Sequence, residues 1–210
     1  MTDPLTEHRV LIGAADWRYP AWTGDFYPED LPEDWRLGYY GNEFPVVGIP
    51  PDYVLDTAGL AALEEDSDGT PGFVVRIAEA GSAAQRLAAA RALGSRCVGV
   101  LVEAADMAPA QLADVLGAGA SLPLAVAGVA ALPAGAPAGV RPCWDGRGDP
   151  PRGAGLKLAC LSAAEATPRR LREVMEGLLA DAAGTAVLLF DGDPPAIEVL
   201  RNAAVIRDLL

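Results

Sequence analysis

The stretch RVLIGAADWRYPAWTGDFYP, residues 9–28, joins an apolar strand pattern to a loop that is rich in aromatic residues. The strand pattern ends at Gly13, and five aromatic residues then fall within eleven positions, although aromatic residues make up only 6% of the chain. Aromatic side chains at this density either cover a hydrophobic core or line a binding pocket. We expect core packing and docking of the following helix, and we keep two alternatives: stacking of a sugar or a nucleobase, and binding of a partner.

The composition indicates one globular domain over residues 1–210. The chain is 51% hydrophobic and 21% charged, which is typical of a folded protein with a substantial core. Its formal net charge of −13 makes it an acidic protein, without the cationic surface that nucleic acids and anionic membranes attract. We therefore expect no nucleic-acid partner and no membrane partner. No apolar run has the length of a membrane span and no signal-peptide pattern is visible, so we expect a cytoplasmic location.

Short apolar strand patterns alternate with helical patterns along the chain, as in a parallel sheet that is buried on both faces. This alternation predicts an α/β fold, a trimmed TIM-type (β/α)8 barrel. An open doubly wound sheet is disfavoured because residues 13–17 lack the glycine-rich phosphate loop of that fold. Residues 130–139 form an Ala/Pro/Gly connector, so we expect a missing or reduced helix between strands five and six. The predicted strands are 9–13, 43–50, 73–78, 97–102, 122–129, 140–145, 154–161 and 186–190, and the predicted helices are 31–41, 52–65, 82–93, 108–116, 167–183 and 196–210.

The two ends of the chain carry a family resemblance. The spacing G-x-x-x-W-x-Y-x-x-W-x-G-x-F-Y-P over residues 13–28 resembles the opening signature of the YecE-like family, also called domain of unknown function 72 (DUF72). Residues 186–193, followed by Asn202-Ala203, are similar to the last strand and helix of that family. The resemblance implies a bacterial-type β/α barrel of unknown function, and it implies no particular reaction.

Between these ends the polar residues of the family pattern are replaced. Arg76 stands where the third strand of the family carries lysine, and Glu103 stands where its fourth strand ends in glutamine. The family's R-x-H-G becomes Lys157-Leu158-Ala159-Cys160, and its F-N-N becomes Phe190-Asp191-Gly192. Active sites of such barrels are built at the C-terminal ends of the strands. The resemblance therefore implies a divergent, shortened member whose site has changed.

Two cations within apolar strands, Arg76 and Lys157, are the first candidates for a functional site. A cation that faces a barrel interior is costly unless it is paired, so we expect a carboxylate partner, with Glu103 the first candidate. The alternative is that either cation points outward past a helix. Arg76, Glu103 and Lys157 are the candidate catalytic residues. The candidate ligand-binding residues at the barrel mouth are Asp16, Trp17, Tyr19, Trp22, Tyr27, Asp145 and Asp191.

The histidine, the cysteines and Asp193 are expected to have structural roles rather than catalytic or metal-binding ones. The single histidine, His8, precedes the first strand, so we expect neither histidine-based catalysis nor a zinc site. Asp193 precedes two prolines and is expected to cap the last helix rather than to bind a metal. The cysteines form no C-x-x-C pair and are expected to be reduced and mostly buried, with Cys160 structural rather than nucleophilic. No metal site is assigned, and the cofactor stays unknown.

Two functions remain open. The first is a non-catalytic or strongly altered barrel that acts as a binding or interaction scaffold for a small molecule or a protein. The second is a carboxylate-rich hydrolase or isomerase, with or without a divalent metal, that acts on a small polar substrate. Converging Arg76, Lys157 and carboxylates would favour the enzyme, whereas a mouth filled by Trp17 and Trp22 would favour the scaffold. We also consider a homodimer formed through the apolar surface that the missing helix leaves.

Overall fold

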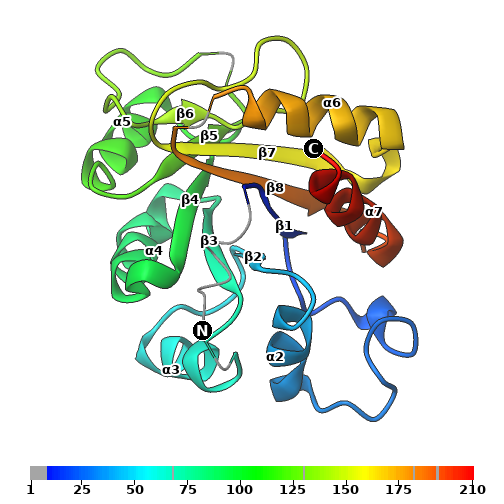
Figure 1. Cartoon of the computed structure of the whole chain (residues 1–210). Coiled ribbons are helices and arrows are strands. Elements are labelled where there is room, and N and C mark those ends of the chain that lie inside the picture. Colours follow the sequence, from blue (N-terminus) through cyan, green and yellow to red (C-terminus); the bar gives the residue numbers. More distant parts are fainter. Residues whose placement is uncertain (1–8, 68, 130, 182, 193) are drawn as a thin grey trace.

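The computed structural model describes residues 9–67, 69–129, 131–181, 183–192 and 194–210, so the predicted roles of His8 and Asp193 lie outside the described residues. One sheet of parallel strands, in the order β6-β5-β4-β3-β2-β1-β8-β7, curls into a barrel (Figure 1). The strands are β1 (Leu11–Ala14), β2 (Val46–Ile49), β3 (Gly72–Ile77), β4 (Cys97–Glu103), β5 (Leu124–Ala127), β6 (Arg141–Pro142), β7 (Leu156–Ser162) and β8 (Thr185–Asp191).

The two ends of the sheet meet next to Trp144, which follows β6. The Trp144 backbone N–H donates to the carbonyl of Leu158 in β7 at 2.9 Å, and the Trp144 carbonyl accepts from the N–H of Cys160 at 3.0 Å. On the other side, the N–H of Cys143 donates to the carbonyl of Val126 in β5 at 2.7 Å. One short segment therefore pairs with both neighbours, as a central parallel strand does. The fold is the predicted TIM-type (β/α)8 barrel, with a nearly closed sheet.

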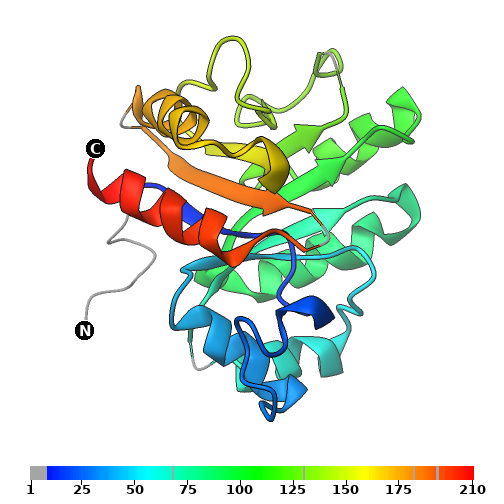
Figure 2. The same ribbon diagram turned by 90° about the vertical axis from the view of Figure 1, so that its right-hand side faces the viewer.

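Helices cover the barrel except between β5 and β7. Among the described residues, the two connections on either side of β6 run as loops, which are yellow-green in Figure 1. The first loop confirms the expected loss of a helix between strands five and six. Figure 2 shows α6 and α7 side by side on the outer face of β7, β8 and β1. The helices are α2 (Arg36–Gly41), α3 (Thr57–Glu65), α4 (Ala80–Ala92), α5 (Pro109–Ala118), α6 (Pro168–Leu179) and α7 (Ile197–Asp208).

The helix ends follow local capping chemistry. The side chain of Asp56 accepts a hydrogen bond from the N–H of Gly59 at the start of α3, and that of Thr167 accepts one from the N–H of Arg170 at the start of α6. Gly94 follows the end of α4 with a φ of 57°, in the left-handed region that glycine tolerates. The last helix begins at Ile197 with Ala196 at its N-cap, next to the predicted start at residue 196.

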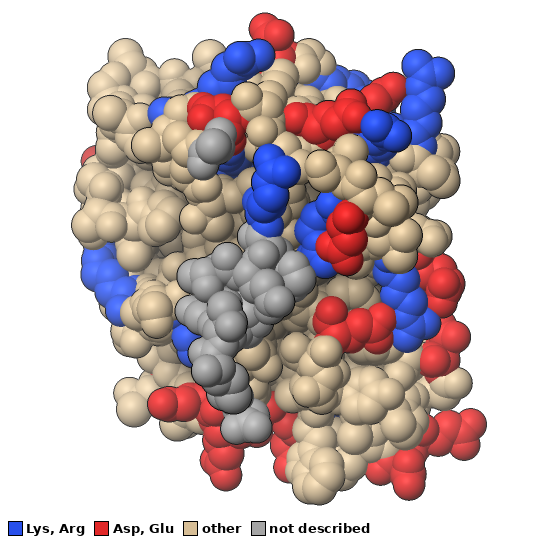
Figure 3. Space-filling view, in the orientation of Figure 1, with Lys and Arg blue, Asp and Glu red and all other residues tan. Residues whose placement is uncertain are grey.

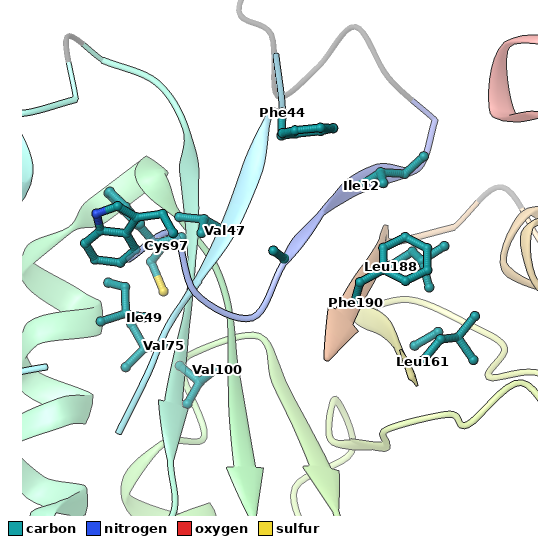
Figure 4. Close-up of a cluster of buried hydrophobic side chains, with 14 of the residues drawn as sticks. Ile12, Phe44, Val47, Ile49, Val75, Cys97, Val100, Leu161, Leu188 and Phe190 are labelled. Carbon is teal, nitrogen blue, oxygen red and sulfur yellow. The ribbon is translucent and has the colours of Figure 1, made fainter. Parts of the chain in front are cut away.

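Strand side chains alternate between two hydrophobic layers, because successive residues of a strand point to opposite faces. Leu156 and Leu158 of β7 belong to the layer that fills the barrel interior. Leu161 belongs to the outer layer, between the strands and the helices, and Figure 4 shows it with Leu188 and Phe190 of β8. Burial of both faces explains why the strands are continuous apolar runs rather than alternating ones.

The aromatic loop packs in the outer layer. Trp22 is 2% exposed, lies parallel to Tyr40 of α2 with ring centroids 6.2 Å apart, and meets Phe26 edge to face. The Nε1–H of Trp22 donates to the carbonyl of Pro195 at 3.0 Å, which ties the loop to the segment before α7. This arrangement confirms the predicted core packing and the docking of the following helix.

Close contact between β1 and β2 requires glycine at position 13. The N–H of Ala14 donates to the Oη of Tyr40 at 2.8 Å, and the Tyr40 hydroxyl donates to the carbonyl of Val46 at 3.0 Å. A Cβ atom on Gly13 would lie 1.8 Å from the Val46 carbonyl oxygen and 2.9 Å from the Tyr40 Oη. Because backbone cannot move away as a flexible side chain can, this position has no room for a side chain.

The charged side chains of both signs are interspersed over the face shown in Figure 3, and no continuous basic surface is visible there. Within the described ranges, the chain contains no helix with the length and apolar character that crossing a bilayer demands. The predicted homodimer would form through an apolar surface at the loops that flank β6. The most exposed of the described large apolar residues lie outside these loops, so the homodimer stays a prediction. These exposed residues are Trp35, Tyr39, Val54, Val205, Leu209 and Leu210.

We expect Gly13→Ala to lower the free energy of unfolding by about 3 kcal/mol or more, because overpacking against backbone cannot be relieved locally. The control is Gly117→Ala in α5, where no atom lies within 4 Å of the added Cβ. Alanine favours helix over glycine by about 1 kcal/mol, so the control should be neutral or stabilising. Urea unfolding followed by circular dichroism measures both, and equal effects would contradict the proposed contact.

Candidate functional site

A cavity of about 250 Å³ opens at the C-terminal ends of the strands, where barrel enzymes build their sites. Most of its wall is apolar and is formed by small residues such as Ala15, Ala105 and Ala127, with Leu101 and Leu189 below. Because these small side chains leave the last layer of the barrel interior unfilled, the cavity forms there. Its polar lining comes from Arg76, Glu103, Cys160 and Asp191.

The Arg76–Glu103 ion pair is the main polar feature of the cavity. The Nε of Arg76 donates to the Oε1 of Glu103 at 2.6 Å, with side-chain exposures of 17% and 29%. Arg76 lies opposite Leu101 in the register of β3 and β4, so Glu103 comes two residues later on the same face. The predicted pairing of Arg76 with Glu103 is confirmed. In the described part of the chain, Glu103 is the only hydrogen-bond partner of the Arg76 side chain.

The charge of Arg76 is retained in this setting. Burial disfavours the guanidinium, but the hydrogen bond and the charge of Glu103 outweigh burial and raise the pKa of Arg76 above its ordinary value. Asp191, at the end of β8, adds a second negative charge near the same guanidinium. The cavity therefore holds one cation and two acidic side chains.

Two thiols meet at the wall of the cavity. Cys143 and Cys160 have their Sγ atoms 3.2 Å apart, with the Cys143 thiol donating, and both are free thiols. The hydrogen bond to Cys143 and burial raise the pKa of Cys160 well above its ordinary value, while the charge of Arg76 acts in the opposite direction. Cys160 is therefore a neutral thiol at pH 7, and as a thiol it is a weak nucleophile.

Lys157 lies away from this cavity. Its Nζ donates to the carbonyl oxygens of Leu178 and Asp181, which lie at and just after the C-terminal end of α6. Lys157 is 2% exposed and comes early in β7, so it faces α6 near the N-terminal end of the barrel. The carboxylate partner expected for Lys157 is replaced by backbone carbonyls, which are the groups that a helix C-terminus leaves free.

Other predicted ligand-binding residues are also placed outside the cavity. Asp16 accepts from the N–H of Trp17 and forms an ion pair with Arg18 at 2.9 Å. Asp145 accepts from the N–H of Arg147 at 2.8 Å in the loop after β6. The aromatic side chains belong to the outer layer or pack against it, and Asp191 is the only one of these seven candidates that lines the cavity. The four aromatic candidates in question are Trp17, Tyr19, Trp22 and Tyr27.

Arg86 supports the cavity from behind and was not identified from the sequence. It is 3% exposed, and its Nε donates to the Arg76 carbonyl at 2.5 Å. Its Nη atoms donate to four carbonyl oxygens at 2.9–3.1 Å, and these belong to Ile49, Pro50, Pro51 and Tyr53. Burial lowers the pKa of Arg86, and the carbonyl dipoles offset the cost of burying its charge. The sequence feature that could have indicated a buried Arg86 is its position in the apolar face of a predicted helix, between Ala83 and Ala90.

The described residues contain no group of three or more histidine, cysteine or acidic side chains that could hold a metal ion. The arrangement that exists is an ion pair, an additional carboxylate and a thiol pair around an apolar hollow. Such a site can bind a small molecule through charge and shape.

Comparisons with known proteins agree with the fold. The family model described as "Protein of unknown function DUF72" matches residues 11–53. A crystal structure of a DUF72 family protein from Enterococcus faecalis is similar to this chain with a TM-score of 0.51 and 9% sequence identity, and the match covers 96% of each chain. No curated protein matches the sequence.

We expect Arg86→Met to lower the free energy of unfolding by about 3 kcal/mol or more, since it leaves buried carbonyl groups without a donor. Arg91→Met, on the exposed side of the same helix, is the matched control and should cost less than about 1 kcal/mol. Urea unfolding of the three proteins tests this. Similar losses for both variants would show that Arg86 does not act as a buried clamp.

A double-mutant cycle should detect coupling between Arg76 and Glu103. We expect a coupling free energy of about 1–3 kcal/mol from Arg76→Ala, Glu103→Ala and the double variant, because the pair is mostly shielded from water. The control cycle uses Arg169 and Glu173, an exposed pair on α6 with side-chain exposures of 89% and 49%. That pair should couple by only about 0.3–0.5 kcal/mol. Equal coupling in the two cycles would disprove a special role for the cavity pair.

Proposed function

We propose that this DUF72 family member is a binding protein for a small metabolite that carries a carboxylate. The observation that supports this proposal is the Arg76 guanidinium, which lines the cavity and is held through its Nε by Glu103. Its two Nη groups have no hydrogen-bond partner among the described residues. A guanidinium with free parallel donors is the group that best fits a carboxylate.

The size and charge of the cavity narrow the ligand class. A volume of about 250 Å³ lies just below the range of about 300–1,000 Å³ that drug-sized ligands occupy. Glu103 and Asp191 disfavour a multiply charged anion but can accept hydrogen bonds from hydroxyl or ammonium groups. We therefore propose a hydroxy or amino acid of a few carbon atoms, with its apolar part against Leu101 and Leu189.

Binding is favoured over the hydrolase or isomerase alternative by the position of Lys157. In that alternative, Lys157 converges with Arg76 and the carboxylates and polarises a substrate oxygen. Lys157 instead bonds to backbone carbonyls next to α6, and the described residues hold no three-membered group of metal-ligating side chains. A protein partner remains compatible with the scaffold role, and the cavity favours a small molecule.

Thermal unfolding with paired compounds tests this function. Glycerate and serine should raise the unfolding midpoint, whereas glycerol and serinamide, which lack the carboxylate, should not. A ligand at about 100 times its dissociation constant adds about 2.7 kcal/mol, which corresponds to a rise of about 5–10 °C for a chain of this size. A panel of further carboxylates, sugars and phosphates extends the search.

The contribution of Arg76 is then measured by titration calorimetry at a temperature where every variant is folded. Arg76→Gln should weaken carboxylate binding by about 10-fold or more, because it removes charge-assisted hydrogen bonds. Arg91→Gln, an equal change of charge far from the cavity, should leave the affinity unchanged. The proposal fails if no carboxylate binds, or if both variants bind with the affinity of the unmodified protein.

A further inference from the structure

Cys143 and Cys160 lie on the two segments whose backbone hydrogen bonds close the barrel. Cys143 follows β6 and Cys160 belongs to β7. The two residues are 17 positions apart in the sequence, and their Sγ atoms are 3.2 Å apart. A disulfide has an S–S distance of about 2.05 Å, so a bond between them requires an approach of about 1.2 Å. Both residues are half-buried and both thiols are free.

The surrounding backbone places the thiols next to each other, and we expect it to permit this approach. The hydrogen bonds of Trp144 to Leu158 and Cys160 set the register between the two segments. In contrast, β6 has only two regular residues, and the described parts of the connections on both sides of it are loops without helices. Short strands between loops are the parts of a fold that adjust at least cost.

We expect a small oxidant to approach this pair from the barrel mouth. Cys160 lines the cavity of about 250 Å³, which opens at the barrel mouth, and Arg76 lines the same cavity. The third cysteine is in a different environment. Cys97 lies in the outer hydrophobic layer (Figure 4), is 9% exposed, and has its Sγ 3.6 Å from the Gly99 carbonyl oxygen.

We propose that Cys143 and Cys160 form a reversible intramolecular disulfide, with a low-molecular-weight disulfide as the oxidant. One cysteine loses its proton to solvent, and its thiolate attacks a sulfur of the small disulfide, which forms a mixed disulfide and releases one small thiol. The second cysteine then loses its proton and attacks the protein sulfur of that mixed disulfide, which releases the second small thiol. Two electrons pass from the cysteine pair to the small disulfide.

The modification acts where β6 is short and where two backbone hydrogen bonds of Trp144 join its segment to β7. A covalent bond from the segment after β6 to β7 adds to the hydrogen bonds of Trp144 and restricts the unfolded chain, so the oxidised protein should unfold at a higher temperature. It also removes the Cys160 thiol from the cavity wall. The proposal depends on the thiol geometry alone and is independent of the carboxylate ligand proposed above.

The test is equilibration of the folded full-length chain in buffers of reduced and oxidised glutathione at mildly alkaline pH. After acid quenching, thiols are counted in denaturant and the intact mass is measured without reductant. We expect the count to fall from three to one, the mass to decrease by two hydrogen atoms, and peptide mapping to show Cys143 linked to Cys160. Dithiothreitol should restore all three thiols.

Serine variants identify the pair. Cys97→Ser should still lose both of its remaining thiols, whereas Cys143→Ser should form no internal disulfide. The proposal is overturned if the unmodified protein keeps three thiols under oxidising conditions, if Cys97 is part of the bond, or if glutathione adducts persist with Cys143 present. The mass and mapping data on the unmodified chain decide the outcome even if a variant does not fold.

Discussion

Two backbone hydrogen bonds between Trp144 and β7 close the barrel. The cavity and the contact between the two thiols both depend on this closure. On the Trp144 side of the barrel, β6 is very short and the described residues of both its connections form loops, so the sheet is joined there by few groups. If the segment after β6 lay elsewhere, β5 and β7 would be open sheet edges with unpaired backbone groups. Closure also creates the cavity, because a barrel interior exists only when the sheet returns to itself. The same two bonds bring the two thiols into contact.

Buried cations organise the other side of the cavity. Arg86 joins the carbonyl groups that follow β2 to the backbone of Arg76, and Arg76 in turn pairs with Glu103 of β4. Three neighbouring strands are thereby linked near their C-terminal ends by groups that cannot be left unpaired without a large cost. These charged residues fix the positions of the strand ends next to the cavity. The apolar layers supply most of the stability.

The segment that matches the DUF72 family model is mainly a packing unit in this chain. Residues 11–53 contain Gly13, Trp22 and Tyr40, which join β1, β2 and the segment before α7. The polar residues of the cavity lie outside this range, on β3, β4, β7 and β8. The family match therefore covers this packing unit, while the polar residues of the cavity come from the rest of the chain. A shared fold does not by itself specify the chemistry of a site.

The sequence by itself determined the alternation of strands and helices, the loss of the helix after β5 and the packing role of the aromatic loop. These features depend on local patterns, such as continuous apolar runs, capping residues and aromatic density. It also indicated the pairing of Arg76 with Glu103, because a cation inside a barrel needs a nearby carboxylate. Only the tertiary structure placed Lys157 against α6, Arg86 against the Arg76 backbone and Cys143 beside Cys160. Strand register and barrel closure decide which distant residues meet, and a one-residue difference in register reverses the face of every side chain.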